Sequence, residues 1–192
     1  MRYFILPGHG NSGPGHWQSL WELEDADFHR IEQSDWENPI REEWVATLEA
    51  AVSAVALTAV PGASSATGGS DIVLVAHSLA CLMVAEWASV APAASLRKIK
   101  GALLVAPVDP HGPAFPGSAR GFGNIPTAAL PFPSLVVASG NDPYATLEYA
   151  HRRARDWGSA FADVGALGHI NGSSGLGAWP QGRILLDSLV RG

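Results

Sequence analysis

The stretch of this chain that most constrains its fold is an apolar strand running directly into an apolar helix. Residues 72–76, Ile-Val-Leu-Val-Ala, form a continuous apolar run typical of a strand buried in a parallel sheet. An almost wholly apolar helical segment follows, with the hydroxyl of Ser78 at the junction. Ala76 and Ala80 flank that serine with small side chains, so strand and helix can approach closely. A turn of this kind pushes a serine out above the sheet edge, which makes Ser78 a candidate nucleophile.

Composition predicts a globular chain. The 192 residues are 47% apolar and 16% charged, so we expect one domain over 1–192 with a substantial core. The formal net charge is −6, and the basic residues form no long run, so nucleic-acid binding is not expected. The lone cysteine, Cys81, cannot form an internal disulfide and supplies no zinc-type cluster.

The sequence shows no targeting or membrane segment. Residues 1–7 are too short and too soon broken by proline to be a secretory signal. No apolar run reaches the ~18 residues expected of a membrane span. We therefore expect a cytoplasmic protein that does not associate with membranes.

Strand-like and helix-like segments alternate along the chain. The predicted strands are 3–6, 28–31, 72–76, 101–106, 134–138 and 160–164, and the predicted helices are 16–24, 39–57, 78–89, 145–156 and 179–190. This alternation predicts an α/β fold with a parallel sheet covered by helices on both faces, where sites lie at the carboxyl ends of the strands. Residues 61–70 are rich in Gly and Ser and are predicted to be a flexible surface loop. The proline-rich segment 107–133 follows a strand and could overhang the site as a small cap.

A serine hydroxyl needs a base, which in turn is oriented by an acid. His169 is the best-placed base, because it follows the last predicted strand and adjoins Gly168; His111 is the second choice. Asp142 follows a strand and gives the order Ser…Asp…His expected after such a turn. The rival acid is Asp109, after the preceding strand.

Acyl transfer also requires donors for the developing oxyanion, and losing one typically costs roughly 3–4 kcal/mol in the barrier. The backbone N–H of Leu79, at the amino end of the helix, is one expected donor. The second is expected from the glycine-rich loop 7–15 after the first strand, where the N–H of His9 follows Gly8. The alternative of a phosphate-binding loop fits poorly, because no Gly-Lys-Ser/Thr ending is present.

Five motifs in order along the chain resemble the α/β-hydrolase superfamily and, within it, the small serine hydrolases related to retinoblastoma-binding protein 9. They are Pro-Gly-His-Gly-Asn-Ser-Gly-Pro-Gly-His-Trp-Gln at 7–18, Trp-Glu-Asn-Pro at 36–39 with Trp44, Ala-His-Ser-Leu-Ala at 76–80, Ala-Ser-Gly-Asn-Asp-Pro at 138–143 and Gly-His-Ile-Asn at 168–171. The resemblance implies a three-layer fold with about six mainly parallel strands and no large lid. It also implies a Ser78–His169–Asp142 triad and activity on carboxylic esters. Trp36 matches a motif position and is a weaker candidate for the substrate pocket.

The resulting hypothesis is a serine esterase that forms an acyl-enzyme on a small-molecule substrate and needs no metal or organic cofactor. Cleavage of amides by the same residues stays open. Ala76 and Ala80 stand where the common pattern has glycines, which motivates a second hypothesis: a protein-binding module that keeps the fold with weak or no catalysis. The sequence does not identify a protein partner.

Overall fold

The computed structural model describes residues 1–56 and 72–191. Its six-stranded sheet has the order β2-β1-β3-β4-β5-β6, and every neighbouring pair of these strands is parallel. The strands are β1 (Arg2–Leu6), β2 (Phe28–Arg30), β3 (Ile72–His77), β4 (Ile99–Val105), β5 (Ser134–Ala138) and β6 (Ala160–Asp163). The predicted strands are therefore confirmed, and β3, which contains the apolar run, is central in the sheet.

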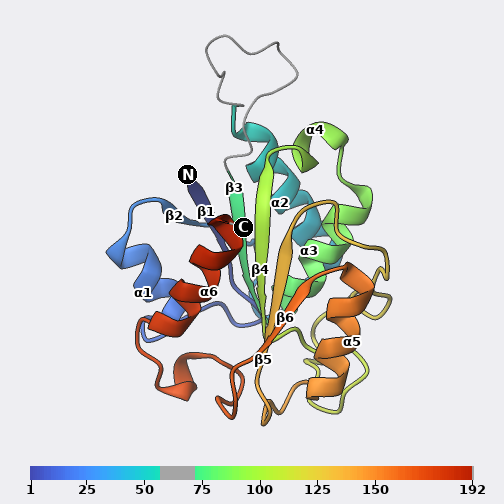
Figure 1. Cartoon of the computed structure of the whole chain (residues 1–192). Helices are drawn as coiled ribbons and strands as arrows, with labels where there is room; N and C mark the ends of the chain where they lie inside the picture. The colour runs from blue at the N-terminus through green and yellow to red at the C-terminus, as the bar shows by residue number, and fades with distance from the viewer. Residues whose placement is uncertain (57–71, 192) are drawn as a thin grey trace.

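Helices cover both faces of the sheet and complete a three-layer α/β-hydrolase fold (Figure 1). On one face lie α1 (Trp17–Glu24) and α6 (Pro180–Arg191). On the other lie α2 (Arg41–Ala54), α3 (Leu79–Val90) and α5 (Leu147–Trp157), with the short α4 (Ala93–Leu96) beside α2. None of the described helices is long and apolar enough to cross a membrane.

The two faces are built by alternation along each strand. In β1, Phe4 and Leu6 contribute to the core under α2 and α3, whereas Ile5 contributes to the core under α1 and α6. All six residues of β3 are buried, because helices cover the strand from both sides. This pattern explains why the central strand is uniformly apolar in sequence.

The sequence-based boundaries agree with the structure to within a few residues for the described elements that were predicted. The four-residue α4 and the 3₁₀ turn η1 (Gly172–Ser174) were not predicted, since neither is long enough to show a helical repeat. The helix predicted over 39–57 ends at Ala54. The predicted loop 61–70 lies outside the described residues.

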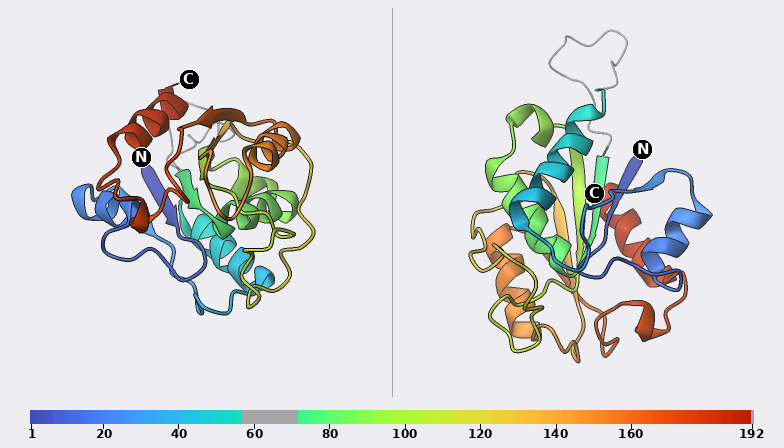
Figure 2. Two further views of the ribbon diagram at one scale, coloured as in Figure 1. Left: turned by 90° about the horizontal axis from the view of Figure 1, so that it is seen from below. Right: turned by 180° about the vertical axis from the view of Figure 1, so that it is seen from behind.

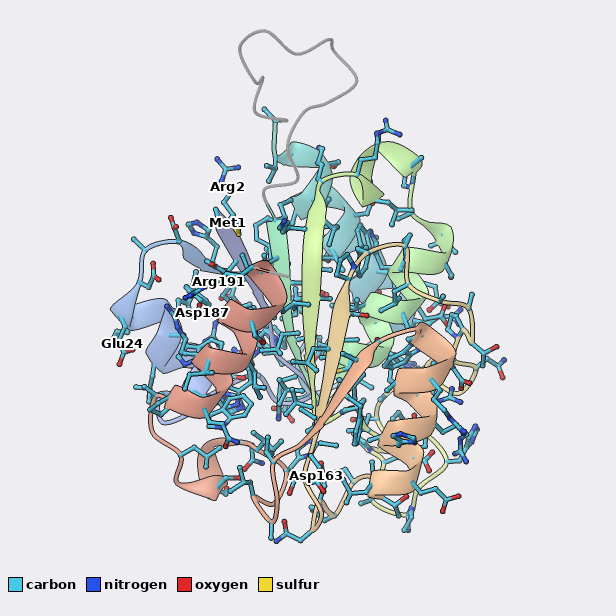
Figure 3. The ribbon with its side chains drawn as sticks, in the orientation of Figure 1. Met1, Arg2, Glu24, Asp163, Asp187 and Arg191 are labelled. Atoms are coloured by element: carbon cyan, nitrogen blue, oxygen red, sulfur yellow. The ribbon has the colours of Figure 1, made fainter. Side chains whose placement is uncertain are left out.

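The parallel strands bring the loops that follow them to one edge of the sheet. In Figure 1 this edge is at the bottom, and Figure 2 (left) shows it from below. Asp163, the last residue of β6, marks the same edge in Figure 3. All the predicted site residues belong to β3–α3 or to loops that follow strands, so the topology alone gathers most of them here.

Candidate active site

Ser78 occupies a tight turn between β3 and α3. Its backbone has φ 60° and ψ −124°, a left-handed conformation that a non-glycine residue adopts only at a cost of about 1–3 kcal/mol. Packing on both sides holds the turn: β3 is buried throughout, and the Ser78 N–H donates to the Val105 carbonyl at 2.9 Å. Ala76 and Ala80, fully buried, fit on either side of this turn. The structure therefore forms the predicted strand–turn–helix with two alanines in place of glycines.

The imidazole of His169 lies within hydrogen-bonding distance of the Ser78 hydroxyl. Its Nε2 is 2.8 Å from Ser78 Oγ, and its Nδ1 is 2.8 and 2.9 Å from the carboxylate oxygens of Asp142. Because a carboxylate accepts, the hydrogen of a neutral imidazole belongs on Nδ1, which leaves Nε2 free to accept from the serine. The side chains of His169 and Asp142 are only 8% and 4% exposed, so these hydrogen bonds are shielded from water.

The rival residues lie elsewhere. The Asp109 carboxylate accepts the backbone N–H of His111 at 2.9 Å. Asp109 and His111 line a separate hollow beside α5 and not the cavity at Ser78. Of the alternatives that the sequence left open, the structure brings only Asp142 and His169 together with Ser78.

The loops after β5 and β6 brace one another and so fix the position of His169. Asn141 Oδ1 accepts the Gly168 N–H at 2.7 Å, and Ser139 Oγ accepts the Leu167 N–H at 2.9 Å. The His169 carbonyl accepts a hydrogen bond from His77 Nε2 at 2.9 Å. The backbone of residues 167–169 is thus held at three points, which positions the His169 side chain without help from a ligand.

Gly8 packs directly against the Ser78 turn. A Cβ added at Gly8 would lie 2.7 Å from Ser78 Cβ and 3.1 Å from Ser78 Oγ, so only glycine allows this close approach. The contact sets the next residue, His9, beside Ser78 in the same cavity. Within the described part of the chain, the backbone N–H groups of His9 and Leu79 donate to no protein acceptor. Two unpaired donors next to the hydroxyl suit a developing oxyanion.

A cavity of about 320 Å³ opens at the Ser78 hydroxyl. Its lining combines four imidazoles, two amides and a few apolar groups: His9, His16, His77, His169, Asn11, Asn171, Leu79, Val108, Ala114, Pro116 and Tyr144. The loop 107–133 does reach the site, through three of these residues. Trp36 is not among the described lining residues; its ring packs edge-on against Trp44, 5.6 Å between centroids.

Burial keeps two of the histidines neutral. It lowers the pKa of His16 to about 4, with a further contribution from the charge of Arg30. Burial likewise holds the pKa of His77 well below its ordinary value. Both rings lie close to His169, with His77 4.9 Å away between ring centroids. Because they stay uncharged near neutral pH, a positive charge that forms on His169 meets no like charge from these two neighbours.

Sequence reasoning assigned no role to four residues that the structure places in the cavity. These are Asn11, His16, Tyr144 and Asn171. The Tyr144 ring lies over His169, with centroids 4.3 Å apart. All four lie in loops that follow strands, so their position was a usable signal. The directions of their side chains could not be predicted from the sequence, because those directions depend on contacts between loops.

Comparison with known proteins agrees with this geometry. The profile of the serine hydrolase family matches residues 3–188. A solved structure from Pectobacterium atrosepticum, named a YdeN-like hydrolase, is 27% identical, with a TM-score of 0.78 over 99% of this chain and 90% of that one. A comparison with curated protein sequences found no match.

Two more distant structures show the fold alone. The ydeN gene product of B. subtilis is 17% identical, with a TM-score of 0.73 over 100% of this chain and 99% of that one. A monoacylglycerol lipase of Paleococcus ferrophilus is 14% identical, with a TM-score of 0.63 over 98% and 93% of the two chains. Since the family profile spans the sheet and every loop that surrounds Ser78, the chain belongs to the serine hydrolase family and is a hydrolase.

Proposed function

We propose that this hydrolase cleaves carboxylic esters of small molecules through an acyl-enzyme on Ser78, with His169 as general base and Asp142 as the residue that orients it. The observation that carries the proposal is the continuous hydrogen-bonded chain from Ser78 Oγ through His169 to Asp142. A protein that had lost catalysis would have no reason to keep a strained backbone at the serine and an aligned base beside it. This argument favours the enzyme over the binding module.

The reaction follows from the geometry. As Ser78 Oγ attacks the carbonyl carbon, its proton passes to His169 Nε2, and Asp142 stabilises the resulting imidazolium. The carbonyl oxygen becomes an oxyanion against the N–H groups of His9 and Leu79. When the tetrahedral intermediate collapses, His169 returns the proton to the departing alcohol oxygen. Water, deprotonated by the same imidazole, then releases the carboxylic acid. An amide substrate would use the same steps, with an amine in place of the alcohol.

We also propose that the chain lies within the branch of the family typified by retinoblastoma-binding protein 9. The support is the set of five motifs described above, which includes the Gly8–His9 loop and the Gly168–His169 loop.

A fluorophosphonate probe tests the proposal, because it phosphonylates an activated serine and spares an ordinary one. We expect the wild-type protein to be labelled once and the Ser78→Ala variant not at all. Ser188→Ala is the matched control, since Ser188 is exposed on α6 and bonds only the Leu185 carbonyl. Release of p-nitrophenol from p-nitrophenyl acetate should follow the same pattern. Labelling or turnover that persists in Ser78→Ala would refute the assignment.

A further inference from the structure

Three side chains in the cavity present hydrogen-bond donors without a protein partner. The first is His16, the N-cap of α1, whose Nδ1 accepts the Gln18 backbone N–H at 3.1 Å. Since Nδ1 is an acceptor and burial lowers the pKa of His16 to about 4, the ring is neutral and its hydrogen is on Nε2. This Nε2–H is buried and has no partner among the described residues.

The other two donors are amides whose orientation is set by their oxygens. Asn11 Oδ1 accepts from Arg30 Nη1 at 2.6 Å and from the Ser12 N–H at 2.7 Å. Asn171 Oδ1 accepts the Ser173 N–H at 3.0 Å, which caps η1. In each amide the oxygen is engaged by the fold, so the NH₂ group remains as a donor, and it has no protein acceptor in the described part of the chain.

These residues form one wall of the site, which we call the donor wall: Asn11, His16 and Asn171. All three line the cavity at Ser78, and all three also line a shallower hollow of about 360 Å³ that continues between residues 13–15 and 172–173. The contribution of the loop 107–133 to the cavity is apolar by contrast, through Val108, Ala114 and Pro116. The two sides of a substrate therefore meet different chemistry.

The position of His169 indicates which part of the substrate meets the donor wall. In acyl transfer the imidazole returns its proton to the leaving oxygen, so the leaving group must lie against His169. Asn171 follows His169 by two residues in the same loop, and both line the cavity. The alcohol part of the substrate thus extends toward the donor wall.

From this arrangement we infer that the donor wall binds a carbonyl-type oxygen in the alcohol part of the ester, such as that of an amide or a second ester. This inference rests on the proposed esterase function and deepens it. Neutral N–H donors can satisfy the two lone pairs of an uncharged carbonyl oxygen, and they accept no hydrogen bond from an ammonium group and make none with an alkyl chain. The favoured substrate is then an ester of an acceptor-bearing alcohol, and esters of long-chain alkyl alcohols are disfavoured.

The test uses two acetate esters with the same heavy-atom skeleton apart from one oxygen. 3-Methyl-2-oxobutyl acetate carries a carbonyl in its alcohol part, and 3-methylbutyl acetate replaces that carbonyl by CH₂. The measured quantity is the ratio of kcat/KM for the two esters. Their difference in intrinsic reactivity is common to every variant and cancels when ratios are compared.

Three variants remove one donor each and keep the acceptor that the fold uses. Asn171→Asp still accepts the Ser173 N–H, Asn11→Asp still accepts from Arg30, and His16→Asp still caps α1, since aspartate is a good N-cap without a donor. Asn124→Asp is the control, because it makes the same change at an exposed amide outside this cavity.

We expect the ratio to fall about tenfold in each donor-wall variant and to stay at the wild-type value in Asn124→Asp. An unchanged ratio in all three variants, with both esters still hydrolysed, overturns the inference and leaves the esterase proposal intact. If wild-type protein hydrolyses neither these esters nor p-nitrophenyl acetate, the esterase proposal fails and the inference fails with it.

Discussion

Substitution of Gly8 tests whether the close packing of the first loop against the serine turn holds the site in place. The Cβ of Gly8→Ala would lie 2.7 Å from Ser78 Cβ and 3.0 Å from the His77 carbonyl oxygen. Carbon atoms in contact normally keep about 3.5–4.0 Å, so one of the two backbones has to move by about 1 Å. Neither partner is the flexible end of a long side chain, so the strain cannot be relieved by a rotamer change.

The consequences for activity and stability follow from that displacement. A shift of about 1 Å between nucleophile and oxyanion donors lowers kcat/KM by about 10²-fold. Overpacking of this kind destabilises by about 1–3 kcal/mol, which corresponds to a fall in Tm of roughly 2–12 °C for a chain of this size. The activity assay is p-nitrophenyl acetate hydrolysis, and Tm comes from thermal unfolding followed by circular dichroism.

Gly13→Ala provides the matched control. Gly13 lies in the same loop, and a Cβ there would meet nothing within 4 Å. We expect this variant to keep wild-type activity and stability. If Gly8→Ala is as active as Gly13→Ala, the close approach of Gly8 to Ser78 does not position the reacting groups, and the reasoning is refuted.

Three further predictions concern the acid, a buried histidine and the cysteine. Asp142→Asn should lower kcat by about 10⁴-fold, while Asp109→Asn should change it little; steady-state kinetics showing the larger loss for Asp109 would contradict the assignment. The pKa of His16 falls from 6.5 to about 4 on folding, so the unfolded chain binds more protons between these values. The contribution of His16 to the free energy of unfolding should therefore be fully present above pH 6.5 and should fall by about 3 kcal/mol as the pH approaches 4. Urea titrations at pH 7 and pH 4.5 measure this decrease. The decrease should be smaller in His16→Asn than in the wild-type protein. Burial raises the pKa of the Cys81 thiol, which donates to the Val105 carbonyl at 3.3 Å. Ellman's reagent should therefore label Cys81 only in urea, and rapid labelling of the native protein would argue against its burial.

Much of the fold was predictable because its signals are local. Each of the four inner strands, β1, β3, β4 and β5, is a largely apolar run, and the period of the pattern indicates the type of element directly. The junction at Ser78 is also local, since a buried strand, one hydroxyl and an apolar helix are consecutive in the chain. The elements that escaped prediction, α4 and η1, span only four and three residues, too few for any periodicity to appear.

The sequence by itself determined the parallel sheet, the serine turn, and the placing of an acid and a histidine in loops after strands. Only the tertiary structure showed that Asp142, and not Asp109, contacts His169, because this depends on which loop reaches a histidine 91 residues beyond the serine. The tertiary structure also showed that Trp36 packs against Trp44 and is not among the described cavity-lining residues. It showed as well that Asn11, His16 and Asn171 line the cavity together. The physical reason is that side-chain directions at the edge of the sheet follow from contacts between loops that are distant in sequence, and no local pattern encodes them.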